Sequence, residues 1–163
     1  MTEVEFLPLF DRWNGMVYAL ALSVTRSPQD AEDISQEVFL TLLERPPAPG
    51  KERAWLARVT VNRCRDLLRS PWRRRREDLD QADRELAFSQ PEEGVLYEAL
   101  GALEPEVRAL LHLRFYEGFG VAELARQFHT TPPALSARLY RAKRQLRRRM
   151  EELSDVTALS EDL

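Results

Sequence analysis

The sequence predicts an all-α fold in which two small helical domains are joined by a linker. Apolar residues recur at every third or fourth position through most of the chain, as they do on the buried face of a helix. No segment shows the alternation of apolar and polar residues that is typical of a strand, and proline-rich or acidic stretches interrupt the helical pattern. With 163 residues, of which 44% are hydrophobic, the chain is large enough to bury a core.

Three helices are predicted in the first half of the chain. The first carries an apolar stripe, formed by Phe6, Phe10, Trp13, Val17, Leu20 and Val24. The second begins at the N-cap Ser27, with Pro28 in its first position, and ends before the proline-rich stretch 46–50. The third runs from about Arg53 to Ser70, because the following Pro71 disfavours a helical conformation at Ser70.

The second half predicts a linker and then a second helical domain. Residues 77–93 are acidic and show little periodicity, so we interpret them as a linker between a domain at 1–76 and a domain at 94–151. Helices are expected over about 95–103, 105–116, 121–128 and 131–150, with a turn at 117–120. Residues 152–163 are predicted to be an acidic, frayed tail.

Charge is distributed in alternating blocks along the chain. Residues 51–76 contain ten basic and two acidic residues, and residues 111–150 contain nine basic and two acidic residues. The segments before, between and after them are acidic, so a net charge of −3 conceals two strongly basic segments. Two basic segments on one chain predict two contacts with a polyanion, most plausibly nucleic acid.

The composition contains few of the residues that commonly form catalytic or metal sites. Cys64 is the one cysteine, and His112 and His129 are the two histidines, so no disulfide within the chain, metal centre or catalytic cluster is expected. There is no glycine-rich phosphate loop, and no cofactor is expected. No run of 18 apolar residues occurs and the N-terminus is acidic, which predicts a cytoplasmic protein without membrane insertion.

Residues 121–150 have the pattern of a helix-turn-helix. Thr131 is predicted to be the N-cap of the second helix, and the apolar residues from Leu135 to Met150 lie on one of its faces. Polar and basic residues lie on or beside the other face: Ser136, Arg138, Arg141, Lys143, Arg144 and Arg148. A helix of this kind can lie in the major groove of duplex DNA. A basic hairpin that binds protein is the alternative.

The helix at 53–70 is basic on one face. Residues of that face recur at spacings of three and four: Trp55, Arg58, Asn62, Arg65 and Arg69. Trp72 and the four arginines after it extend the basic surface. Aromatic rings among arginines suit single-stranded DNA, because bases stack on the rings while the cations follow the phosphates. A place in the core is the alternative for Trp55.

The helix at 28–45 is acidic on one side, which Asp30, Asp33, Glu37 and Glu44 occupy. Carboxylates in a first turn stabilise a helix N-terminus, which explains Asp30 but not Glu37. Asp33 and Glu37 lie four residues apart, and such like-charged pairs destabilise a helix slightly. This arrangement predicts a basic protein partner.

These three elements, taken in order, resemble the conserved regions of bacterial sigma factors. The stretch DAEDISQEVFL at 30–40 resembles region 2.2, and residues 54–69 resemble regions 2.3 to 2.4. Residues 103–108, 123–125 and 136–143 resemble region 4. A chain with only these two domains is similar to an extracytoplasmic-function sigma factor.

The resemblance implies a function and a set of sites. Such a factor binds core RNA polymerase and directs it to promoter DNA, and an anti-sigma factor is the expected further partner. Polymerase binding is implied for Asp30, Asp33, Gln36 and Glu37. Opening of the −10 element is implied for Trp55, Arg58, Asn62, Arg65, Arg69 and Trp72. Reading of the −35 element is implied for Thr131, Ser136, Arg138, Tyr140, Arg141, Lys143 and Arg144.

This chain departs from the family at the turn of the helix-turn-helix. The turn usually has glycine where this chain has His129, so a non-glycine residue is expected in a left-handed conformation there. Two other functions compete with the sigma factor interpretation. A helix-turn-helix regulator would need a symmetric dimer and would leave the acidic helix unexplained. A recombinase would need a nucleophile and a base or metal cluster within residues 1–90, where histidine is absent.

Overall fold

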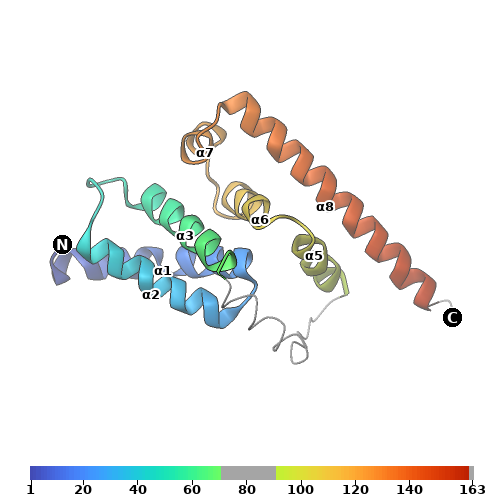
Figure 1. Ribbon diagram of the computed structural model, residues 1–163, viewed down its shortest axis with the longest axis horizontal. Helices are drawn as coiled ribbons and strands as arrows, with labels where there is room; N and C mark the ends of the chain where they lie inside the picture. Colours follow the sequence, from blue (N-terminus) through green and yellow to red (C-terminus); the bar gives the residue numbers. More distant parts are fainter. Residues whose placement is uncertain (71–90, 162–163) are drawn as a thin grey trace.

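The computed structural model describes residues 1–70 and 91–161, and every regular element in these ranges is helical (Figure 1). This confirms the predicted all-α fold. In chain order the elements are α1 (Glu3–Thr25), α2 (Pro28–Glu44), α3 (Glu52–Leu68), α5 (Pro91–Gly101), α6 (Pro105–Leu111), the π-helical turn η2 (His112–Tyr116), α7 (Val121–Gln127) and α8 (Pro132–Glu161).

The first three helices form one bundle in which α1 packs against both α2 and α3. A capping box starts α1, because the Thr2 hydroxyl accepts from the Glu5 amide at 3.3 Å and the Thr2 amide donates to the Glu5 carboxylate at 2.9 Å. Val17, Leu20 and Val24 of the predicted stripe are buried. The stripe thus supplies the core that holds α2 and α3 in place.

The boundaries of α2 confirm the sequence prediction. Arg26 ends α1 in a left-handed conformation, with φ of 60°, and the Ser27 hydroxyl then accepts from the Asp30 amide at 3.3 Å. Pro28 occupies the first helical position, where its missing N–H is not needed. The helix ends at Glu44, just before Pro46.

The second bundle is built around α8, which packs against α5, α6 and α7. One continuous helical stretch was predicted at 105–116, and the structure forms it as α6 followed directly by η2. Leucines from α6, η2, α7 and α8 meet in the core and are buried: Leu110, Leu113, Leu124, Leu135 and Leu139. The helix-turn-helix is therefore fixed by the same core that holds α6.

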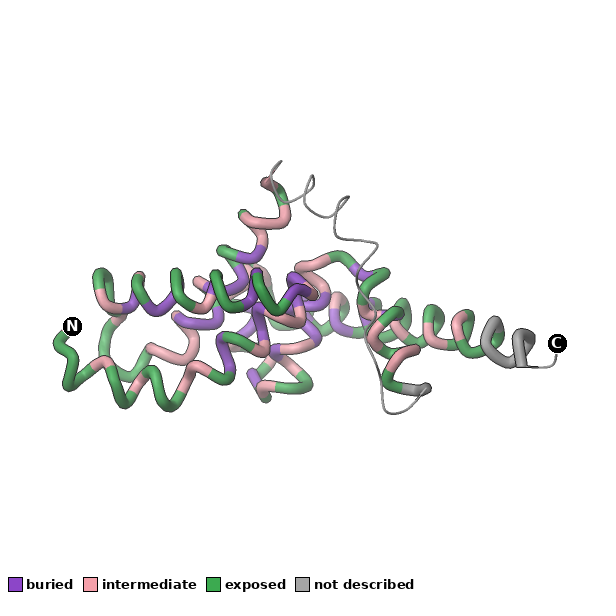
Figure 2. The backbone as a smooth tube through the Cα atoms, turned by 90° about the horizontal axis from the view of Figure 1, so that it is seen from below, coloured by how far each residue is buried: buried purple, intermediate pink, exposed green. Residues whose placement is uncertain are grey.

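The two bundles meet along α6, which packs against α1 and α3. Their buried residues join in a single hydrophobic cluster that runs from Met16 in α1 to Ala142 in α8. The tube coloured by burial shows buried segments gathered in the middle of the molecule, whereas the N-terminal end of α1 and the far end of α8 are largely exposed (Figure 2). The two predicted domains thus share a packed interface.

Two predicted boundaries differ from the structure. Helix α5 begins at Pro91, inside the predicted linker, while Trp72 and most of the linker lie outside the described residues. Helix α8 continues to Glu161, where a frayed tail was predicted. Residues 151–161 contain neither proline nor glycine to stop the helix, and an Arg149–Glu152 ion pair of 3.1 Å spans the junction.

Candidate functional site

The outward face of α2 is acidic and carries one exposed leucine. Asp33, Gln36 and Glu37 are exposed, as predicted for a surface that binds a partner. Leu40 lies one turn after Gln36 and Glu37 and is 56% exposed, so it adds an apolar side chain to their face. Sequence analysis did not single out Leu40, although its spacing from Gln36 and Glu37 places it on their face.

Asp30 differs from the other three predicted polymerase contacts because it is buried. It is 1% exposed, and its backbone amide donates to the Ser27 cap. Its carboxylate lies in the first turn of α2, where the helix dipole favours a negative charge. The structure therefore gives Asp30 a place in the helix start, and the exposed acidic face begins at Asp33.

A groove lies beside this face, between α2 and α3. It has a volume of about 390 Å³ and is lined by Asp30, Asp33, Ile34, Glu37, Arg63, Asp66 and Leu67. Arg63 is the one basic side chain in that lining, and the carboxylates outnumber it. The surface as a whole suits a basic partner that also offers an apolar contact.

The predicted −10 residues of α3 have different surroundings. Arg58, Asn62 and Arg69 are exposed. Trp55 is partly buried and packs against the hydrophobic core, as the alternative interpretation expected. Arg65 donates to the Glu106 carboxylate of α6 at 3.0 Å. Trp72 lies outside the described residues.

The turn and start of α8 have the geometry expected of a helix-turn-helix. His129 has φ of 54°, which confirms the left-handed conformation predicted for it. The Thr131 hydroxyl accepts from the Ala134 amide at 3.3 Å and so caps α8 as predicted. Arg138 lies over the ring of Phe128, at 5.6 Å from the ring centre, and this contact ties α8 to the end of α7.

Burial of one side of α8 presents the other side to solvent. Leu135, Leu139 and Ala142 face the core. The predicted −35 residues Ser136, Tyr140, Arg141, Lys143 and Arg144 are exposed, and Arg138 is half-buried. Tyr140 is 63% exposed and supports the Arg144 guanidinium at 5.8 Å from its ring centre. The outward side of α8 therefore presents exposed polar and basic side chains to solvent.

Two family models match this chain, one for each bundle. The model for Sigma-70 region 2 matches residues 9–74, and the model for Sigma-70 region 4 matches residues 93–146. Together they cover the three-helix bundle and the helix-turn-helix in the expected order. The chain belongs to the sigma-70 family.

Similar proteins place this sigma factor in the extracytoplasmic-function (ECF) branch. It is 30% identical to ECF RNA polymerase sigma factor SigE of Mycolicibacterium smegmatis, over 88% of this chain and 61% of SigE. It is 29% identical to SigL of Mycobacterium tuberculosis, over 89% of this chain and 88% of SigL. It is also 29% identical to BldN of Streptomyces coelicolor, over 86% of this chain and 58% of BldN.

The fold of this sigma factor is also found among solved structures. It resembles a chain in the co-crystal structure of the sigma factor RpoE in complex with the anti-sigma factor NepR from Bartonella quintana. The TM-score is 0.69 at 18% sequence identity, over 90% of this chain and 97% of that chain. The similarity in fold therefore extends over both bundles.

The described residues of this sigma factor contain neither a membrane-spanning helix nor a cluster of metal ligands. Within residues 1–70 and 91–161, no helix combines the length and the apolar character that are needed to cross a bilayer. The same residues contain no group of three or more histidine, cysteine or acidic side chains placed to hold a metal ion.

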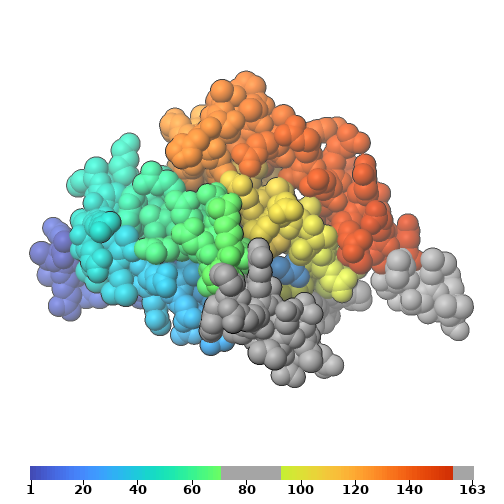
Figure 3. All heavy atoms as spheres, in the orientation of Figure 1, coloured from blue at the N-terminus to red at the C-terminus, as the bar shows by residue number. Residues whose placement is uncertain are grey.

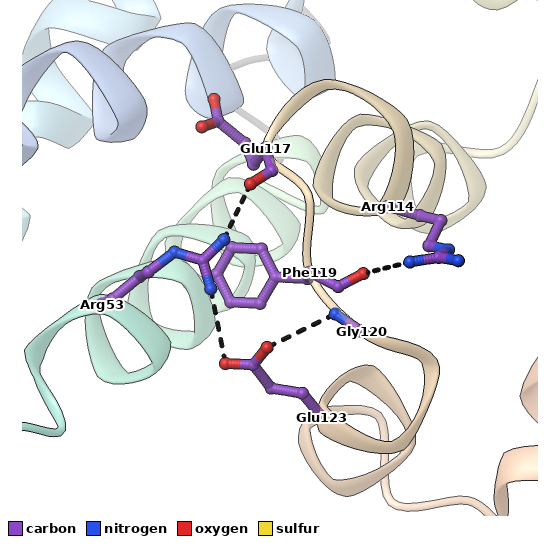
Figure 4. Close-up of polar contacts among 6 residues, drawn as sticks. All are labelled: Arg53, Arg114, Glu117, Phe119, Gly120 and Glu123. Carbon is purple, nitrogen blue, oxygen red and sulfur yellow. Dashed lines mark hydrogen bonds and ion pairs between the residues drawn. The ribbon is translucent and has the colours of Figure 1, made fainter.

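Sequence analysis missed a cluster of contacts around Arg53, at the start of α3 (Figure 4). The Arg53 guanidinium lies 3.6 Å from the ring centre of Phe119, which is fully buried. It donates to the Glu117 carbonyl at 2.7 Å and pairs with the Glu123 carboxylate at 3.5 Å. No local pattern could identify this cluster, because Arg53 lies 64 residues before Glu117 in sequence.

His112 adds a pH dependence to this sigma factor. Burial lowers the pKa of its imidazole below the ordinary value of 6.5, although the Glu117 carboxylate at 3.1 Å acts in the opposite direction. Below about pH 6.5 the unfolded chain therefore binds more protons at this residue than the folded chain does, so folding stability should fall as the pH falls.

The variant His112→Gln should remove this dependence. Urea unfolding at pH 7.5 and pH 5.0 should show that the wild type loses more of its free energy of unfolding than the variant does. The two proteins differ only at residue 112, so the comparison isolates the contribution of His112 together with its contact to Glu117. Equal losses in the two proteins would contradict the role of His112.

Proposed function

We propose that this chain binds core RNA polymerase and directs it to promoters. The observation that carries the proposal is the division of charge between neighbouring helices of a matched Sigma-70 region 2, with acidic residues exposed on α2 and basic residues on α3. The names of SigE and SigL, which are RNA polymerase sigma factors, support it. The chain acts by binding, in the cytoplasm, where the polymerase is found.

The polymerase contact is assigned to the outward face of α2. Asp33 and Glu37 supply negative charge, Gln36 supplies hydrogen bonds, and Leu40 supplies an apolar contact one turn further along. Exposed charges around an apolar anchor are a common design of specific interfaces, because the charges select the partner and the anchor excludes water. Asp30 is buried and lines the groove beside this face, so we assign it mainly a role in positioning the start of α2.

Opening of the −10 element is assigned to α3. Arg58, Asn62, Arg65 and Arg69 offer cations and an amide for one DNA strand, and Trp72 remains a predicted stacking partner. Separating bases from a duplex costs a few kcal/mol per base, which stacking on protein side chains and phosphate contacts offset. The partial burial of Trp55 suggests that it holds α3 in position while its neighbours contact the strand.

Reading of the −35 element is assigned to α8. The capped start of the helix carries Thr131 and Ser136, which would meet base edges in the major groove. Arg141, Lys143 and Arg144 follow on the exposed side and would contact phosphates or bases. An anti-sigma factor is a further expected partner, and the fold similarity to a sigma factor solved with NepR supports this expectation.

A single substitution in α8 tests the DNA-binding part of the proposal. Arg141→Ala should weaken binding to duplex DNA by about 1–3 kcal/mol if it contacts a base, and otherwise flatten the salt dependence by about one unit. The probe is a duplex that the wild-type chain has selected from a random-sequence library.

The matched control is Arg149→Ala, which removes the same charge from the same helix. Arg149 pairs with Glu152 at 3.1 Å and lies beyond the predicted DNA-binding residues. Fluorescence anisotropy over a range of salt concentrations measures both variants. If Arg141→Ala and Arg149→Ala had the same effect, α8 would not read DNA through the assigned residues.

A further inference from the structure

We infer that two copies of this chain pair through the C-terminal half of α8, with the two helices antiparallel. The inference goes beyond the proposed function and does not depend on it. Helix α8 continues past α5 to the C-terminal end of the molecule (Figure 1). In the space-filling view, α8 forms the upper right edge, and no coloured atoms of another element cover its outer side (Figure 3). Much of this helix is therefore accessible to a partner.

The first argument is the division of charge along α8. Residues 138–149 contain seven basic and no acidic residues, whereas residues 151–161 contain four acidic and no basic residues. Arg149 and Glu152 pair at the junction, but α8 is one continuous helix, so the rest of the acidic segment cannot fold back over the basic one. Lys143 and Asp155 lie about 18 Å apart along the helix axis, well beyond the roughly 10 Å at which salt screens exposed charges. The two segments can meet only between molecules.

The second argument is a groove on one face of α8 that presents both charges. It has a volume of about 520 Å³, and the described residues that line it all belong to α8: Lys143, Leu146, Arg147, Met150, Glu151, Ser154 and Asp155. The four charged side chains in this lining are exposed, while Leu146 and Met150 are partly buried. Along the helix, the face therefore presents two cations, then Met150, and then two carboxylates.

The third argument is that the spacing of these charges specifies a two-fold arrangement. Lys143 and Asp155 each lie six residues from position 149, and Arg147 and Glu151 each lie two residues from it. In a two-fold antiparallel pair, residues at equal distances on either side of the axis face each other, and each contact occurs twice. An axis at position 149 brings Lys143 opposite Asp155 of the second copy and Arg147 opposite its Glu151, which gives four ion pairs.

A second copy of the chain is therefore the occupant that this face fits. Met150 is the apolar lining residue nearest the axis, so two of these flexible side chains can pack against each other between the ion pairs. Exposed ion pairs contribute little individually and are screened by salt, so the pairing is expected to be weak and to loosen as the salt concentration rises. Lys143 is also a proposed −35 residue, so pairing and DNA binding would compete for its side chain.

The test exchanges charges within the full chain. Lys143→Glu with Arg147→Glu makes the charges of the groove face all acidic, and Glu151→Lys with Asp155→Lys makes them all basic. Each variant alone places like charges opposite each other, whereas a mixed pair of the two variants restores all four attractive contacts. Sedimentation velocity at about 50 mM salt, where screening is weak, measures association of the wild type, of each variant and of their equimolar mixture.

The matched controls change the net charge equally outside the groove. Arg141→Glu with Arg148→Glu corresponds to the acidic variant, and Asp11→Lys with Glu98→Lys corresponds to the basic variant. All four positions are exposed, and none of them lines the groove. Each control should therefore associate with itself as the wild type does.

We expect each groove variant to associate with itself at least about tenfold more weakly than the wild type, and the mixture to recover most of that loss. A mixture that associates as weakly as its two components would overturn the two-fold pairing. Groove variants that associate no more weakly than their controls would overturn the placement of the interface on this face. A wild-type chain that stays monomeric up to about 500 μM would overturn pairing altogether.

Discussion

The variant Asp33→Arg, Glu37→Arg is expected to lose at least about 100-fold in affinity for core RNA polymerase, or about 3 kcal/mol. Both carboxylates are exposed on the outward face of α2, so their replacement leaves the core of the bundle untouched. Two arginines there reverse the sign of the charge that the proposed basic partner meets. Like charges placed against each other cost several kcal/mol, because they lose attraction and add repulsion.

A charge-matched control separates this effect from a general change in net charge. Asp11→Arg with Glu98→Arg changes the net charge equally at exposed positions of α1 and α5. Gel filtration of each protein with bacterial core RNA polymerase gives the first comparison, and titration of a labelled chain gives the affinity. If the two double variants bound equally well, the polymerase contact would have to lie elsewhere than on α2.

Phe119→Ala is expected to destabilise the protein by about 3–5 kcal/mol, the usual cost of removing a large buried aromatic side chain. Phe119 is fully buried between the two bundles, where the Arg53 guanidinium packs against its ring. The substitution leaves a cavity and removes a cation–π contact. Small proteins have only about 5–15 kcal/mol of stability, so the loss is a large part of the total.

Phe115→Ala is the matched control for this prediction. Phe115 lies four residues earlier in η2 and is 57% exposed, so its removal should cost less than about 1 kcal/mol. Urea unfolding followed by circular dichroism gives both free energies. Equal losses in the two variants would contradict the placement of Phe119 in the interface.

Local signals in the sequence were sufficient to predict where most of the helices lie. Ser27 and Pro28 predict the start of α2, and Thr131 predicts the start of α8, because helix capping depends only on residues that are neighbours in sequence. The left-handed conformation of His129 was predicted from the resemblance, because the family usually has glycine at that position of the turn. These features needed no knowledge of the tertiary structure.

The interface between the bundles could not be predicted in this way. Arg53 and Arg108 look like ordinary members of amphipathic helices, and their acceptors lie 64 and 85 residues away in sequence. Phe119 sits in a segment that was interpreted only as a turn, yet it is fully buried. Whether such residues are buried depends on which helix surfaces pack against each other. The spacing of apolar residues along one helix does not show which other helix it packs against.

The candidate sites show the same division. Periodicity placed Asp33 and Glu37 on an exposed face, but it could not distinguish them from Asp30, which the start of α2 buries. It grouped Trp55 with Arg58 although Trp55 packs against the core. The position of α8 as an exposed basic helix was predictable, because one apolar and one basic face suffice to orient it.

Mapping of transcription start sites tests the central claim most directly. Core RNA polymerase transcribes a library of random-sequence duplex templates with and without the wild-type chain, and the 5′ ends of the transcripts are sequenced. We expect the chain to create new start sites that share two upstream sequence elements at a constant spacing, one for α8 and one for α3. An identical set of start sites with and without the chain would contradict its assignment as a promoter-directing factor.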